Sequence, residues 1–125
     1  MFASYKYHCP KCDSELNHNK RVQLNIMKDE RLFTVISLNP KPGEYDYECE
    51  PQVDFKKGEL LDFHCPACKE NLQSDRFKDF ISIVLRPADK INFEVLFDRG
   101  AGQHTTYVMT EDMIEKHGEH PKDLI

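Results

Sequence analysis

The chain has 125 residues, enough for one domain of ordinary size, and it combines 39% hydrophobic with 31% charged residues. This composition supplies a modest apolar core and argues against global disorder. Acidic residues outnumber basic ones by 22 to 17 and give a formal charge of -5, which disfavours binding to a phosphate backbone. No apolar run approaches the roughly 18 residues of a membrane-spanning helix, so we expect no transmembrane segment.

The first residues, 1–6, lead into a Cys-Pro motif without an apolar stretch. We therefore expect no signal peptide and a cytoplasmic location. In a reducing compartment, closely spaced cysteine pairs are typical of metal sites rather than of disulfides. The first such pair is the knuckle Cys9-Pro10-Lys11-Cys12.

Three β-strands are predicted after the first knuckle. Their sequences are short, partly alternating and rich in β-branched and aromatic residues. The expected strands are residues 22–27, 32–38 and 44–50. Residues 28–31 form the turn of a hairpin between the first two strands, and the Pro/Gly connector 39–43 precedes the third.

The third strand of this half alternates between apolar and acidic side chains. The apolar face, which is expected to pack inward, consists of Tyr45, Tyr47 and Cys49. The acidic face consists of Asp46, Glu48 and Glu50. The acidic face is typical of a solvated edge strand, and docking of a basic partner is the alternative. Cys49 has no partner motif and is interpreted as a half-buried core thiol, with a redox sensor as the alternative.

The second half of the chain repeats this plan. A shift of 56 positions places the run Tyr7 to Cys12 on the run Phe63 to Cys68, and Leu16 on Leu72. The expected strands are residues 80–85, 91–97 and 103–109. The glycine-containing loop 98–104 is interpreted as a flexible hairpin loop, and a small-ligand cradle is the alternative.

A short helix is predicted near the C-terminus. Thr110 is a suitable N-cap, acidic residues occupy the first turn, and Gly118 can end the helix at the C′ position. The other positions that favour the helix are Glu111, Asp112, Met113, Ile114, Lys116 and His117. Residues 119–125 are polar and are expected to form a tail.

The four knuckle cysteines together match the ligand set of one structural zinc ion. A C-x2-C turn directs two thiolates at one tetrahedral ion, and two such turns complete its shell. The expected ligands are Cys9, Cys12, Cys65 and Cys68. Because 52 residues separate the knuckles, the fold must bring them together, which would couple zinc binding to folding. His8 and His64 are expected to support the ligand loops or lie on the surface, and ligand replacement is the alternative.

These patterns predict a mainly β fold in a single domain, residues 1–125. Two knuckle-plus-strand units, about 1–58 and 59–118, would be related by internal duplication and an approximate twofold. Their cysteines would be pooled at one zinc ion. The order in which the strands pair is not determined by the sequence pattern.

The two CPxC knuckles, each preceded by an aromatic residue and a histidine, resemble those of zinc ribbons. They also resemble small bacterial CPxC zinc-binding proteins of unassigned function. This resemblance covers about 15 residues and implies a structural zinc held by the four cysteines. Zinc ribbons serve transcription, translation and protein docking alike, so the resemblance implies no single role.

The preferred function is a protein-interaction or regulatory module rather than an enzyme. Nucleic-acid binding by a zinc ribbon is one alternative, which the acidic balance disfavours. Thiol oxidoreductase activity is the other, because CPxC resembles the glutaredoxin active site. That activity requires a helix after the motif to lower the thiol pKa, and neither knuckle is followed by a helical pattern.

Overall fold

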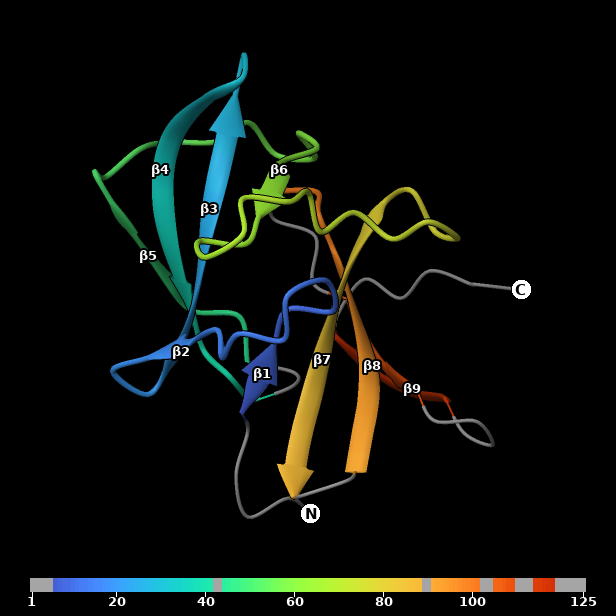
Figure 1. The fold of residues 1–125 in the computed structure, drawn as a ribbon. Coiled ribbons are helices and arrows are strands. Elements are labelled where there is room, and N and C mark those ends of the chain that lie inside the picture. The colour runs from blue at the N-terminus through green and yellow to red at the C-terminus, as the bar shows by residue number, and fades with distance from the viewer. Residues whose placement is uncertain (1–5, 42–43, 89–90, 102–104, 110–113, 119–125) are drawn as a thin grey trace.

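The computed structural model contains two antiparallel β-sheets (Figure 1). It describes residues 6–41, 44–88, 91–101, 105–109 and 114–118, and contains no helix within these ranges. In chain order the strands are β1 (Tyr7–His8), β2 (Asn17–His18), β3 (Arg21–Lys28), β4 (Arg31–Leu38), β5 (Tyr47–Glu50), β6 (Asp62–His64), β7 (Phe80–Ala88), β8 (Ile91–Asp98), β9 (Thr105–Met109) and β10 (Ile114–Gly118). The prediction of a mainly β fold is confirmed.

Each sheet is built around one of the two predicted hairpins. The N-terminal sheet has the order β2-β3-β4-β5, with β6 also paired to β3, and the C-terminal sheet has the order β1-β7-β8-β9-β10. The β3–β4 hairpin closes through Asp29 and Glu30, whose φ angles are 51° and 63°. Positive φ at both central residues is the geometry of a two-residue turn that matches the right-handed twist of the strands.

The two short strands next to the knuckles cross to the opposite sheet. β1 precedes the first knuckle but pairs with β7, where Tyr7 lies opposite Leu85. β6 precedes the second knuckle but pairs with β3, where Phe63 lies opposite Ile26. Each sheet therefore contains a strand from the other half of the chain.

The core lies between the two sheets and includes the residues that flank the knuckles. Alternate positions of β3 and β7 point into it, as the period of two in a strand requires. The most deeply buried aliphatic side chains of this core are Leu24, Ile26, Leu72, Ile81, Ile83, Leu85 and Val95, whereas Leu96 belongs to a separate cluster with Phe80 and Tyr107. Cys9 and Cys65 belong to the same cluster, so the knuckles are part of the core.

One local prediction is wrong, and another holds only in part. Residues 114–118 form β10, paired with β9 in the register Ile114↔Met109 to Gly118↔Thr105, rather than the end of a helix. Pairing with β9 gives one side of this backbone its hydrogen bonds. It overrides the capping signals of a helix too short to be stable alone. The remaining helix positions, 110–113, and the tail 119–125 lie outside the described residues.

The second correction concerns the apolar face of the third strand. Tyr47 is 52% exposed, although Cys49 on the same face packs against the core. Tyr45 and Cys49, two residues before and after Tyr47, are half-buried, and the Tyr45 hydroxyl lies 3.0 Å from that of Thr106 in β9. The face packs inward only in part.

Candidate metal centre

The first knuckle is a tight turn held by its own backbone. The amide of Cys9 donates to the carbonyl of Ser14 at 3.0 Å, and the amide of Asp13 donates to the carbonyl of Cys9 at 2.9 Å. The amide of Lys11 points at Cys9 Sγ at 3.3 Å. Asp13 closes the turn with a φ of 62°, a conformation that aspartate tolerates better than most residues.

The second knuckle has the same hydrogen bonds at positions shifted by 56. Cys65 donates to the carbonyl of Glu70 at 3.0 Å, Lys69 donates to the carbonyl of Cys65 at 2.9 Å, and the amide of Ala67 points at Cys65 Sγ at 3.3 Å. Lys69 has a φ of 69°. Lysine has no preference for the left-handed conformation. This conformation at Lys69 could therefore be predicted only from its alignment with Asp13 in the shifted repeat.

The fold brings all four predicted cysteines together. The Sγ atoms of Cys9, Cys12, Cys65 and Cys68 lie within 4.8 Å of one another. Two separations across the knuckles, Cys9 to Cys68 and Cys12 to Cys65, are 3.8 Å. The two sulfurs of a disulfide are about 2.05 Å apart. Two sulfurs that each lie about 2.3 Å from the same tetrahedral ion are about 3.8 Å apart. The four sulfurs are positioned to bind one metal ion.

The sulfurs differ in burial and in pKa. Cys9 and Cys65 are buried, Cys68 is half-buried and Cys12 is exposed. Burial raises the pKa of Cys9 to about 12 and also raises that of Cys65. Hydrogen bonds from the side chain and the backbone of Ser14 lower the pKa of Cys12 to about 6. Burial penalises the thiolate at the first cysteine of each knuckle, and a bound cation would offset this penalty.

The two histidines support the knuckle turns. Nδ1 of His8 lies 3.1 Å from the carbonyl oxygen of Asp13, and Nδ1 of His64 lies 2.8 Å from that of Lys69. Since a carbonyl only accepts, Nδ1 must carry the proton in both. Within the described residues no histidine belongs to the sulfur cluster. The interpretation of His8 and His64 as supports of the ligand loops agrees with this geometry.

Cys49 lies apart from the cluster of four cysteine sulfurs. It is half-buried and packs against the core, and its pKa is raised by that burial. A raised pKa leaves little thiolate at neutral pH, so the side chain is a poor nucleophile. The interpretation as a half-buried core thiol is confirmed.

The surroundings of the knuckles lack the helix that a CPxC redox site uses. The described residues that follow them, 13–41 and 69–88, contain strands, turns and no helix. No helix dipole is therefore available there to stabilise a thiolate.

The described part of the chain also has no helix long and apolar enough to span a membrane.

The predicted glycine loop 98–104 is described only in its first part. Residues 102–104 lie outside the described residues. Gly100 forms a bridge with Leu60, and its amide donates to Asp98 Oδ1 at 2.8 Å. In this part the loop joins the C-terminal sheet to the segment before β6.

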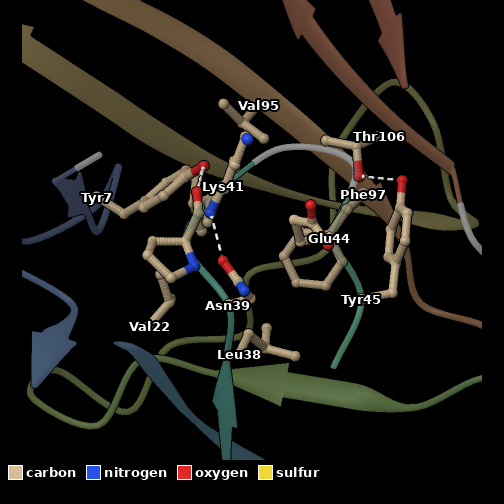
Figure 2. A pocket seen from close by; sticks show the side chains of 12 residues that line it. Tyr7, Val22, Leu38, Asn39, Lys41, Glu44, Tyr45, Val95, Phe97 and Thr106 are labelled. Atoms are coloured by element: carbon tan, nitrogen blue, oxygen red, sulfur yellow. Dashed lines mark hydrogen bonds between the residues drawn. The ribbon is translucent and has the colours of Figure 1, made fainter. Parts of the chain in front are cut away.

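A separate small pocket lies between the sheets, with a volume of about 70 Å³. Figure 2 shows Val22, Leu38, Val95 and Phe97 among its lining residues, with Lys41 and Glu44 from the connector before β5. The Tyr7 hydroxyl donates to the carbonyl of Pro40 at 2.6 Å, and the hydroxyls of Tyr45 and Thr106 lie 3.0 Å apart. These bonds tie the connector to the C-terminal sheet. Sequence reasoning missed the pocket because its residues come from both halves of the chain.

No protein-family model, curated protein or solved structure matches this chain. The resemblance of the knuckles to zinc ribbons therefore stays a prediction, as do the domain boundaries and the internal duplication.

Proposed function

We propose that this protein is a structural-zinc module of a reducing compartment such as the cytoplasm, and that it acts by binding another protein. The observation that carries the zinc assignment is the cluster of four sulfurs within 4.8 Å. A site with four thiolates favours zinc, and it leaves no open position for a substrate. The ion would serve structure rather than catalysis.

The position of the cluster supports a structural role. Each knuckle follows a strand that pairs in one sheet and leads toward strands of the other. An ion held by both knuckles would therefore fasten the two sheets to each other. When bound, zinc would supply positive charge that stabilises four thiolates, two of which the core otherwise keeps protonated.

The proposed test is the metal content of protein purified without added metal, combined with thermal melts before and after chelation. We expect one zinc per chain and a large loss of stability when it is removed. A metal-free protein with an unchanged melt would overturn the proposal and favour the thiol oxidoreductase. In that case dithiol turnover should disappear in Cys9→Ser.

Nucleic-acid binding is the competing assignment for a zinc ribbon. The formal charge of -5 opposes it, because neutralising phosphates requires a concentrated basic surface. A salt-sensitive complex with RNA or DNA, retained on the zinc-loaded protein, would favour that assignment instead.

A further inference from the structure

We propose that the outer edge of β5 binds an extended segment of a partner protein in which basic and apolar residues alternate. This inference rests on the protein-interaction role proposed above. The binding mode is addition of a strand to the N-terminal sheet.

The backbone of β5 has one side free to pair. β5 ends the order of the N-terminal sheet, and within the described residues it pairs only with β4. The amide of Asn39 donates to the carbonyl of Asp46 at 3.3 Å. Asn39 and Asp46 are therefore a hydrogen-bonded pair. Hydrogen-bonded and non-hydrogen-bonded pairs alternate along antiparallel strands, so the backbone groups of Glu48 and Glu50 bond to Ser37 and Val35 of β4. The N–H and C=O groups of Tyr47 and Cys49 therefore point outward.

The charge at this edge is not neutralised. Glu48 and Glu50 are exposed and share one face of β5, and neither has an ion-pair partner among the described residues. By contrast, Arg21 lies 3.1 Å from Asp46 and Lys28 lies 3.2 Å from Glu59. A basic side chain placed opposite either free glutamate would gain the attraction of a cross-strand pair of opposite charge.

The other face of the edge suits apolar side chains. Tyr47 is 52% exposed, and its ring offers a large apolar area at a small loss of rotamer freedom. An open hollow along β5 and the next segment is lined by residues 47–54, which include Glu48 and Glu50 as well as Tyr47. An added strand would place alternate side chains beside Tyr47 and Cys49 on this face.

A second copy of the chain does not fit this edge. In an antiparallel pair, residues opposite each other point to the same face of the sheet. Self-pairing through the outward groups of Tyr47 and Cys49 would therefore set the acidic face of one β5 against that of the other. Like charges directly opposite each other are destabilising, so the edge favours a basic partner over itself.

The test is a titration of zinc-loaded, isotopically labelled protein with a short, end-blocked peptide of alternating lysine and valine. We expect saturable shifts of the amide signals of Tyr47 and Cys49, weakening as salt is added. A peptide of alternating glutamate and valine should not bind. The matched charge variants are Glu48→Lys, which should weaken binding about tenfold, and Glu30→Lys at the β3–β4 turn, which should leave it unchanged.

A second pair of variants separates strand addition from simple charge attraction. Tyr47→Pro removes an outward N–H and keeps the bonds to β4, a substitution that edge strands tolerate. It should weaken binding more than Tyr47→Ala, which removes the ring and keeps the donor. The spectra of both variants report whether the fold is retained.

The β5 proposal would be overturned by the absence of saturable binding, by binding undiminished in Tyr47→Pro, or by signal changes confined to other strands. Dimerisation through β5, seen as dilution-dependent shifts of the same amides, would also overturn it. Because the titration uses protein of verified zinc content, these results leave the structural-zinc assignment intact. Absence of zinc from the purified protein would contradict that assignment separately.

Discussion

At the scale of single residues, the two cysteines of each knuckle have different surroundings. The first cysteine of each pair is nearly inaccessible, at 1% for Cys9 and 0% for Cys65. Each accepts a hydrogen bond from the amide two residues later. Amide donors of this kind orient a thiolate ligand and stabilise its charge. The repeated geometry implies that the two knuckles contribute equally to the site.

We predict that Cys9→Ser and Cys65→Ser damage the protein to similar degrees. Each variant removes a buried ligand and should lower the free energy of unfolding by about 4 kcal/mol or more, with loss of the metal. Cys49→Ser is the matched control, because it alters a half-buried cysteine outside the cluster and should cost only about 1 kcal/mol. Metal analysis and denaturant melts check all three. Markedly unequal effects of the first two would show that one knuckle dominates.

A second prediction concerns the carboxyl group of Asp46. The Asn39 side chain donates to it at 3.0 Å and Arg21 donates at 3.1 Å, and both hold the pKa of Asp46 below its ordinary value. We expect Asn39→Ala to raise this pKa, measured by following the Asp46 carboxyl signal during an NMR pH titration. The pKa of Asp13, which is lowered by Arg86, should stay unchanged.

The sign of the pH dependence follows from the direction of this shift. Because the folded pKa of Asp46 lies below the unfolded one, its contribution to stability is present above the unfolded value, about 3.9. It is lost as pH falls through the folded pKa. Asn39→Ala should therefore flatten the acid limb of the stability curve slightly, and a steeper limb would contradict the assignment.

At the scale of elements, the β3–β4 hairpin shows a turn whose geometry the sequence does not favour. Both turn residues, Asp29 and Glu30, have positive φ. Aspartate tolerates this conformation, whereas glutamate has no such advantage. The turn forms because its twist matches the long, well-paired strands on either side.

We predict that Glu30→Gly stabilises the protein by up to about 1 kcal/mol. Asp-Gly is a preferred pair for this turn, and relief of the left-handed cost at residue 30 should outweigh the added flexibility of the unfolded chain. The control is Arg31→Gly in the adjoining strand, where φ is not positive and glycine should destabilise. Denaturant melts of both variants measure the free energy of unfolding. A lower value in Glu30→Gly than in the unsubstituted protein would contradict the prediction.

At the scale of the whole molecule, the exchange of β1 and β6 makes the two sheets interdependent. β1 adds to the C-terminal sheet from the first half of the chain, and β6 adds to the N-terminal sheet from the second. The loops that follow these strands lie close together (Figure 1), and their four cysteine sulfurs lie within 4.8 Å of one another. A metal ion bound by these four sulfurs would connect the two halves of the chain as well as the two knuckles.

We predict that chelation of the metal loosens both sheets together. Without the ion, β1 and β6 should lose their anchors, and hydrogen exchange should accelerate in β3 and β7, the strands with which they pair. Exchange measured by mass spectrometry, with and without chelator, tests this. Acceleration confined to residues 9–13 and 65–69, or to one sheet alone, would contradict the prediction.

Local patterns in the sequence were sufficient to predict the elements that neighbouring residues specify. The C-x2-C spacing identified all four clustered cysteines, and the alternation of β-branched and aromatic residues located both hairpins. The repeat of the run Tyr7 to Cys12 at Phe63 to Cys68 anticipated knuckles that share one geometry. These features could be predicted because a tight cysteine turn and a strand face are set by neighbouring residues.

The tertiary structure alone decided how those elements pair. Nothing local assigns β1 to β7 or β6 to β3, because strand pairing is made by hydrogen bonds between residues distant in sequence. Residues 114–118 show the same effect, since pairing with β9 displaced the helix that capping residues favoured. Tyr47 lies on the face that the alternation of its strand predicts, but the packing of the two sheets leaves its side chain 52% exposed. The local pattern specified which side chains share a face, and the packing of the two sheets specified which of those faces are covered.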